Sequence, residues 1–215
     1  MQLDTVIFPV AGQGTRMLPA TKAVPKELLP VYDTPLLQFA VDEALAAGAR
    51  RLVFVSHRSK PALEAYMSRD AELEADLDAK GKTGPLADLM STGASSDVQV
   101  IFTYQEAPLG LGHAVACAAP YVGQGPVGVI LPDDLILNPG CLAAMADAYG
   151  QSGAKSLIAG MEVPINQVSR YGIFAAKAPH GDTIPATGLV EKPDPAVAPS
   201  RLAAIGRYVL SPDIF

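Results

Sequence analysis

The sequence predicts a Rossmann-like α/β sandwich of three layers, in which helices cover both faces of a mixed, mostly parallel central sheet. Strand-like and helix-like segments alternate along much of the 215-residue chain, as in parallel strands joined by crossover helices. The final third is rich in hairpin-like strands, so the later strands should join the sheet in mixed directions. A chain of this length can bury one substantial core, so we expect residues 1–215 to form a single domain.

Each early element rests on its pattern of apolar residues. Residues 5–10 are an apolar run that predicts a buried first strand, and residues 36–48 have helical spacing and a closing glycine. Residues 51–56 are β-branched and predict a strand, and residues 61–68 begin another helix. Residues 70–96 are charged at first and then rich in Gly, Ser and Thr. We expect this stretch to be a helical, partly mobile surface excursion.

The later elements follow the same logic. Residues 98–103 and 127–131 predict strands, and residues 112–119 and 139–149 predict helices. Strand-like segments then dominate, at residues 156–163, 173–177, 184–191 and 203–210. Ligands in such folds gather at the carboxyl ends of the strands, so polar residues that directly follow strands are the candidates for a site.

Composition narrows the class of protein. The formal net charge of −6 argues against a nucleic-acid surface, whose footprint is basic. The sequence shows no signal-peptide pattern before the first strand and no apolar run of membrane-spanning length. Cys117 and Cys141 lie far apart in apolar helical contexts, which indicates reduced core residues. We therefore expect a cytoplasmic protein that binds neither nucleic acid nor membrane.

The segment after the first strand has the composition of a phosphate-binding loop. It contains Gly12 and Gly14, followed by Thr15 and Arg16, with Lys26 ten residues further on. Glycines allow the backbone to approach a ligand and to turn its N–H groups toward it. Together with two cations, these features predict a polyphosphate cradle and therefore a nucleotide substrate.

Two better-known glycine motifs do not match this segment. Met17 stands where the dinucleotide-binding motif needs its third glycine, and no Gly-Lys-Ser/Thr tripeptide completes a Walker A loop. A tight strand–turn–helix connection without a ligand is therefore an alternative on these residues alone. The next segment, residues 19–30, contains three prolines and cannot be helical throughout. Arg16, Lys22 and Lys26 stand in or just before it without alternating acids, which favours the cradle.

The segment AGQGTRMLPATKAVPKELLPVYDTP (residues 11–35) resembles the signature of the sugar-1-phosphate nucleotidylyltransferases. Thr21-Lys22 and Pro25 favour the bacterial UTP–glucose-1-phosphate uridylyltransferase branch over the related thymidylyltransferases. The similarity continues in order through QEAPLGLGHAV, VILPDD, RYG, VEKP and IGRYVLSPDIF, and so it covers the whole chain. It implies a fold of the nucleotide-diphospho-sugar transferase type.

Carboxylates and a glutamine near strand ends are candidates for binding a metal ion and a base. Asp133 and Asp134 end the fourth strand-like run, where acids commonly cap a helix but can also bind Mg²⁺, which prefers one or two carboxylates plus phosphate oxygens. The resemblance implies that Asp133 is the Mg²⁺ ligand, and it leaves the role of Asp134 open.

The amide of Gln105 offers a donor and an acceptor, which suits a uracil edge. The resemblance assigns it that role together with Ala11, Gly12 and Gly110.

The sugar side is implied by the resemblance. Lys192 would contact the sugar phosphate, Glu191 the glucose hydroxyls, and the backbone amide of Gly172 the sugar. On the residues alone, an exposed Glu-Lys pair is usually a solvated surface. His113 packs or caps a helix in the ordinary interpretation and is not expected to be catalytic. His57 and His180 have no partner spacing that suggests a metal site or a triad.

The implied reaction transfers UMP from UTP to glucose 1-phosphate and releases UDP-glucose and pyrophosphate. Arg16 and Lys26 would neutralise the UTP phosphates, Mg²⁺ on Asp133 would bridge phosphate oxygens, and Lys192 would hold the incoming sugar phosphate, without a covalent intermediate. Alternatives are a thymidylyl- or other nucleotidylyltransferase, and a weakly active nucleotide-sugar-binding regulatory relative. The resemblance also implies a homo-oligomer. Family members continue past the equivalent of Phe215 with substrate- and metal-contacting acids and oligomer-forming helices, so we expect this chain to lack that segment.

Overall fold

The structure, a computed structural model, describes residues 1–137, 139–176 and 183–215. Within these residues the main sheet has eight strands in the order β5-β4-β1-β6-β10-β8-β9, and β7 also pairs with β10. The strands are β1 (Thr5–Pro9), β4 (Arg51–Ser56), β5 (Gln99–Tyr104), β6 (Val127–Ile130), β7 (Ser156–Glu162), β8 (Gly172–Ala176), β9 (Ala186–Glu191) and β10 (Leu202–Leu210). The short strands β2 (Pro30–Val31) and β3 (Thr34–Pro35) pair separately.

The sheet is parallel where the early strands lie and antiparallel where the late strands join. β1 pairs in parallel with both β4 and β6, and β4 pairs in parallel with β5. β10 runs antiparallel to β6, β7 and β8, and β8 runs antiparallel to β9. The predicted α/β sandwich with a mixed sheet is therefore confirmed. The strand order reverses direction beside β1, which is where open sheets of this kind bind ligands.

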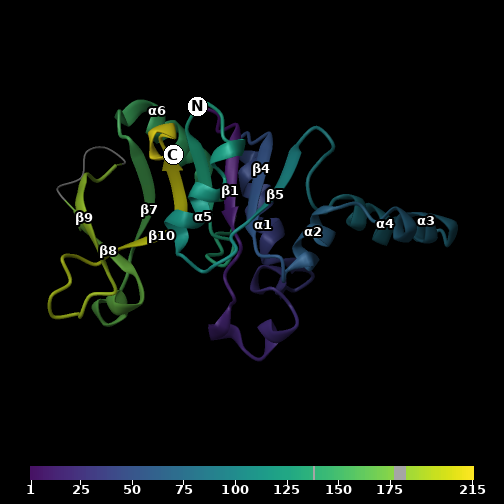
Figure 1. Ribbon diagram of the computed structural model, residues 1–215, viewed down its shortest axis with the longest axis horizontal. Coiled ribbons are helices and arrows are strands. Elements are labelled where there is room, and N and C mark those ends of the chain that lie inside the picture. Colours follow the sequence, from purple (N-terminus) through teal and green to yellow (C-terminus); the bar gives the residue numbers. More distant parts are fainter. Residues whose placement is uncertain (138, 177–182) are drawn as a thin grey trace.

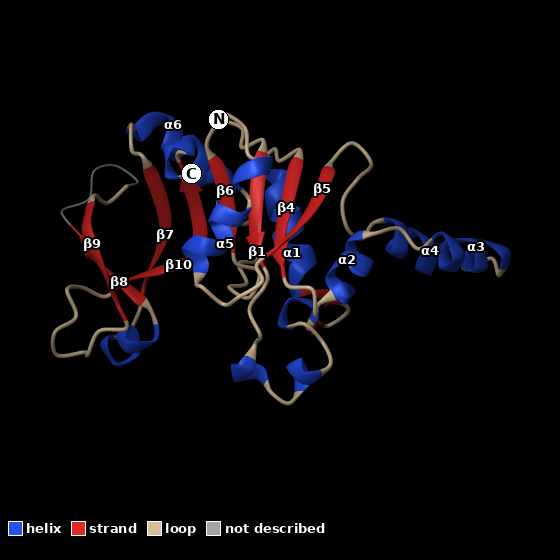
Figure 2. Cartoon of the chain, in the orientation of Figure 1, coloured by secondary structure: helices blue, strands red, loops and turns tan. Residues whose placement is uncertain are grey.

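Helices cover both faces of the sheet (Figure 2). The helices are α1 (Leu36–Ala46), α2 (Pro61–Met67), α3 (Ala71–Ala79), α4 (Thr83–Met90), α5 (Leu111–Cys117) and α6 (Leu142–Ser152). Alternate residues of β1 face opposite layers because side chains alternate along a strand. Phe8 packs in a cluster with residues of α1 and α6, whereas Ile7 packs in a cluster with residues of α5. These two apolar clusters hold the three layers together.

Most predicted elements are confirmed, with boundaries that shift by a few residues. The predicted excursion over residues 70–96 contains α3 and α4, which project away from the sheet as a helical arm (Figure 1); its mobility stays a prediction. The three-proline segment contains only short 3₁₀ turns, at Ala20–Lys22 and Lys26–Leu28. Lys177, predicted to end a strand, lies outside the described residues.

The largest boundary error concerns the helix predicted over residues 139–149. It begins at Leu142 and ends at Ser152. Gly140 has a φ of +74°, in the left-handed region, so the chain turns there before the helix begins. The Glu43 carboxylate then accepts hydrogen bonds from the backbone N–H groups of Cys141 (2.9 Å) and Leu142 (3.0 Å). A side chain remote in sequence therefore caps this helix.

Among the residues that the structure describes, no helix is both long and apolar enough to cross a membrane.

Candidate functional site

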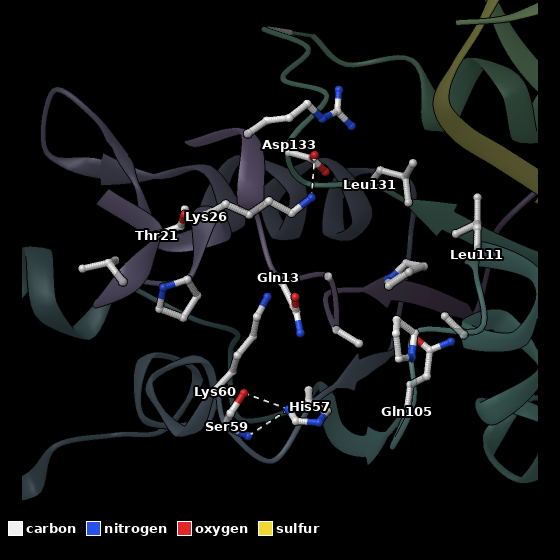
Figure 3. Close-up of a pocket in the computed structure, with 18 of the residues that line it drawn as sticks. Gln13, Thr21, Lys26, His57, Ser59, Lys60, Gln105, Leu111, Leu131 and Asp133 are labelled. Atoms are coloured by element: carbon white, nitrogen blue, oxygen red, sulfur yellow. Dashed lines mark hydrogen bonds and ion pairs between the residues drawn. The ribbon is translucent and has the colours of Figure 1, made fainter. Parts of the chain in front are cut away.

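A cavity of about 670 Å³ opens at the carboxyl ends of the parallel strands. Its lining includes Ala11 after β1, His57 after β4, Gln105 after β5 and Asp133 after β6. The loop and 3₁₀ turns between β1 and β2 supply the rest of one wall, including Lys26. Lys26 and Asp133 lie on one side of the cavity, and Gln105 lies on the other (Figure 3).

The glycine loop, residues 11–16 after β1, has a part that lines the cavity and a part that forms a turn. Ala11, Gly12 and Arg16 line the cavity, as predicted. Gly14 and Thr15, also predicted to bind nucleotide, are not among the lining residues described. Gly14 has a φ of +66°, and a Cβ there would meet the Thr21 side chain at 3.1 Å. Its carbonyl also accepts a hydrogen bond from the Thr21 hydroxyl at 2.8 Å. Gly14 therefore shapes the turn that precedes Thr21.

Lys26 and Asp133 form an ion pair at one side of the cavity, with 2.6 Å between Nζ and Oδ2. Their side chains are 18% and 29% exposed, so water only partly screens the pair. The sequence assigned these residues separate roles, to phosphate and to metal. The structure brings them together because one follows β1 and the other follows β6, and these two strands are parallel neighbours. The site therefore holds a cation and an anion within reach of the same ligand.

Asp134 differs from Asp133 in environment. Burial of the carboxylate, and after it the charge of Asp133, raises the pKa of Asp134, while a hydrogen bond from the Gly206 backbone opposes the shift. Gly206 is required here, since a Cβ at this position would meet Asp134 Oδ2 and Leu131 Cβ, each at 2.7 Å. Asp134 is thus packed against β10, and Asp133 is the carboxylate that lines the cavity.

Gln105 is 6% exposed and presents its side-chain amide at the far side of the cavity. Its Nε2 donates to the carbonyl of Gly110 at 3.0 Å and lies 2.9 Å from His113 Nδ1. Gly110, also predicted as nucleotide-binding, lines the cavity with a φ of +92° at the start of α5. The donor half of the Gln105 amide is therefore already used within the protein, contrary to the expectation that donor and acceptor would both face the base.

Sequence reasoning missed a buried ion pair beneath the cavity. Glu27 is fully buried, and Lys60 Nζ lies 3.0 Å from its Oε2 and donates to the carbonyl of Val10 at 2.7 Å. Burial raises the pKa of Glu27 and lowers that of Lys60, and in each case the charge of the partner opposes the shift. Lys60 itself lines the cavity. The pair fixes the end of β1 where the glycine loop begins.

A second buried pair supports the loop that carries Asp133. The guanidinium of Arg207 donates to Glu43 Oε2 through Nε (3.0 Å) and Nη2 (2.8 Å), and the side chains are only 2% and 5% exposed. Arg207 Nη1 also donates to the carbonyls of Leu131 and Asp134, on either side of Asp133. A lone arginine within the apolar run of β10, and the acids Asp42 and Glu43 within the largely apolar helix α1, were the signals that could have suggested this pair.

The residues predicted to bind sugar lie together, but outside the cavity lining. Gly172 is paired with Glu191 across β8 and β9, and Lys192 Nζ lies 2.6 Å from Glu191 Oε1. Lys192 has a φ of +47°, unusual for a residue with a side chain, and its N–H donates to the Tyr171 carbonyl at 2.9 Å. Burial, followed by the charges of Asp134 and Glu191, raises the pKa of Tyr208 on the neighbouring strand β10.

The histidines and cysteines that the structure describes show no catalytic arrangement. His57 Nδ1 lies 2.8 Å from Ser59 Oγ and accepts from the Ser59 N–H at 3.2 Å. His113 contacts Gln105, as described above, and His180 lies outside the described residues. Cys117 and Cys141 are free and partly buried, and burial raises the pKa of Cys141 to about 11, so this thiol stays protonated near neutral pH.

A metal ion would have to share its ligands with the substrate. Within the described ranges, no cluster of three or more His, Cys, Asp or Glu could hold a metal by itself. Mg²⁺ binds through one or two carboxylates together with phosphate oxygens and water. Asp133, a cavity carboxylate beside the loop predicted to bind phosphate, fits that requirement.

Comparison with known proteins places these features in a family context. Residues 6–215 match the family described as nucleotidyl transferase. The chain is 44% identical over 224 residues to the UTP–glucose-1-phosphate uridylyltransferase of Escherichia coli K12, a match that covers 100% of this chain and 72% of that protein. It is 41% identical over 211 residues to the Bacillus subtilis enzyme of the same name, covering 97% and 71%.

A solved structure agrees with the sequence matches. The UTP-bound UGPase of Acinetobacter baumannii superimposes with a TM-score of 0.90 at 40% identity, covering 99% of this chain and 75% of that one.

Proposed function

Because this chain belongs to the nucleotidyl transferase family, we propose that it transfers UMP from UTP to glucose 1-phosphate, the reaction for which its relatives are named. The observation that carries the proposal is the cavity at the carboxyl edge of the sheet. It collects the glycine loop, Lys26, Asp133 and Gln105 from three separate strand ends. These are the groups that a nucleoside triphosphate needs: backbone amides and cations for phosphate, a carboxylate for a metal, and an amide for the base.

The phosphates of UTP would lie along the glycine loop, with the charges of Arg16 and Lys26 beside them. An oxygen of the sugar phosphate attacks the α-phosphorus in line, and pyrophosphate leaves. Both reactants are anions, so charge neutralisation and positioning supply most of the catalysis. The attacking phosphate is already ionised near neutral pH, so no general base is required. Lys26 is held in place by Asp133 before any substrate binds, which reduces the ordering needed in the transition state.

Asp133 would hold a Mg²⁺ ion, with substrate phosphates and water as the remaining ligands. When bound, such an ion polarises phosphoryl oxygens and offsets the charge that develops on the leaving group. The ion pair with Lys26 keeps the Asp133 carboxylate at the cavity surface. Arg207, through the carbonyls of Leu131 and Asp134, fixes the loop that presents it.

Glucose 1-phosphate would approach from the β8–β9 hairpin. Gly172, Glu191 and Lys192 lie together there, with a backbone amide, a carboxylate and an ammonium group available for sugar and phosphate. The homo-oligomeric assembly expected from the sequence stays a prediction.

The test is pyrophosphate release from UTP and glucose 1-phosphate in the presence of Mg²⁺. Asp133→Ala should lower turnover by orders of magnitude while folding normally, because a metal-binding carboxylate contributes several kcal/mol to charge stabilisation. Asp97→Ala is the matched control, since Asp97 is exposed, contacts Arg50 and Ser95, and is not among the residues that line the cavity. Near-parent activity of folded Asp133→Ala at limiting Mg²⁺ would refute the metal assignment. Absence of UTP-dependent pyrophosphate release by the unaltered protein would refute the function.

A further inference from the structure

The orientation of the Gln105 amide is fixed by its surroundings. A carbonyl oxygen can only accept a hydrogen bond, so the Gln105 atom 3.0 Å from the Gly110 carbonyl must be the NH₂ group. The second contact of this NH₂ group is His113 Nδ1, at 2.9 Å. An imidazole nitrogen accepts only when it carries no proton, so His113 is in the tautomer with its proton on Nε2. Both amide protons of Gln105 are then used.

The oxygen of the same amide remains available to a ligand. Among the described residues, no donor bonds to Gln105 Oε1, and no buried side-chain oxygen or nitrogen lacks a partner. Oε1 is therefore not sealed within the protein. Since Gln105 lines the cavity opposite Lys26 and Asp133 (Figure 3), its free oxygen is an acceptor at the end of the cavity remote from the phosphate-binding groups.

We propose that His113 is a positioning residue for base selection, which prevents the Gln105 amide from flipping and so keeps an acceptor facing the base. This inference rests on the proposed function and specifies how the same site chooses its nucleotide. Uracil carries a proton on N3 and can donate to Oε1. Cytosine carries a lone pair on N3, which would face the lone pairs of Oε1. A flipped amide would present NH₂ instead and would accept cytosine.

His113 can act in this way without touching the nucleotide. It is exposed and is not among the residues described as lining the cavity. Flipping the Gln105 amide would break its hydrogen bonds to both Gly110 and His113. Removing the His113 acceptor leaves only Gly110 to oppose the flip. The loss of one neutral hydrogen bond corresponds to roughly a 2- to 10-fold change in an equilibrium ratio.

The test compares two near-isosteric replacements. In Asn the Oδ1 acceptor is attached to Cγ, as Nδ1 is in His, whereas Leu places a methyl group there. His113→Leu should lower the ratio of kcat/KM for UTP to that for CTP by roughly 2- to 10-fold, and His113→Asn should largely retain it. Asn is the poorer helix former, so a purely structural effect on α5 would rank the two variants in the opposite order.

Controls separate this inference from the proposed function. Ala116→Leu and Ala116→Asn introduce the same two residues at an exposed position of α5, and neither should alter the ratio. Equilibrium binding of UTP and CTP, measured in parallel, gives the ratio independently of turnover. If the unaltered protein binds UTP in preference to CTP but releases no pyrophosphate, the function is wrong and the inference can still be tested. An unchanged UTP/CTP binding ratio in His113→Leu, or equal losses in the Leu and Asn variants, would overturn it.

Discussion

Replacing Arg207 by Met tests whether a buried charge holds the Asp133 loop in place. The substitution keeps an unbranched apolar side chain but leaves the Glu43 carboxylate buried without its ionic partner. Both side chains are at most 5% exposed, so water cannot replace the lost contact. Removing one member of such a pair costs about 3–5 kcal/mol. In a domain of this size, each 1 kcal/mol lowers the Tm by roughly 2–4 °C, so the expected fall is about 6–20 °C.

The same variant should lose activity by more than its stability explains. Arg207 donates to the carbonyls of Leu131 and Asp134, which flank Asp133, so its loss frees the loop that carries the carboxylate. We expect the kcat for pyrophosphate release to fall well below that of the unaltered protein at temperatures where the variant is still folded. Thermal unfolding followed by circular dichroism, together with the pyrophosphate assay, measures both effects.

Two controls make the Arg207 result decisive. Arg50→Met is the same substitution in a pair that is 64% exposed on each side, so it should cost no more than about 1 kcal/mol. The double variant Arg207→Met with Glu43→Leu removes both charges and should recover part of the stability. It should not recover activity, because the carbonyls of Leu131 and Asp134 still lack their hydrogen-bond donor. A Tm decrease below about 2 °C in Arg207→Met, or a double variant no more stable than the single one, would contradict this reasoning.

Two further predictions concern the other charged groups of the site. Lys60→Met should destabilise the protein by about 3–5 kcal/mol near neutral pH, because Glu27 remains buried and charged. Burial raises the pKa of Glu27 above its usual 4.5, so protonation of Glu27 favours the folded state. The loss of unfolding free energy in the variant should therefore become smaller as the pH falls toward 4.5. Urea unfolding at two pH values measures this difference. Lys26→Ala should chiefly impair UTP use and the chemical step, whereas Lys192→Ala should chiefly raise the KM for glucose 1-phosphate. Each variant loses a charge-assisted contact worth about 1.5–3 kcal/mol. Equal losses for the same substrate in both variants would contradict a two-sided site.

The sequence predicted the parts of the site that depend on local pattern. An apolar strand followed directly by glycines, an aspartate or a glutamine places those residues at the carboxyl edge of a parallel sheet. Gly12, Asp133 and Gln105 all line one cavity for this reason. Gly14 and Thr15 were predicted to contact the nucleotide on the same motif; the structure places them in a left-handed turn and the 3₁₀ turn that follows, and their contact with a nucleotide stays a prediction.

The parts that the sequence did not predict are long-range pairs of charges. Glu43 and Arg207 are separated by 164 positions, and Lys26 and Asp133 by 107. No local pattern indicates which acid meets which base, because the pairing follows from the strand order and from the packing of α1 against β6 and α6. The late start of α6 has the same cause, since its cap is the carboxylate of Glu43 and not a neighbour in the sequence.

The two buried pairs lie where the cavity needs rigid walls. Lys60, held by Glu27, binds the carbonyl of Val10 at the start of the glycine loop. Arg207, held by Glu43, binds the carbonyls on both sides of Asp133. A buried ion pair is often no more stabilising than a well-packed apolar pair, so stability alone does not account for two of them at one edge of the sheet. An apolar pair would fill the same space but could not donate to these carbonyls. The charges therefore contribute most by fixing the two loops that bring Lys26 and Asp133 together.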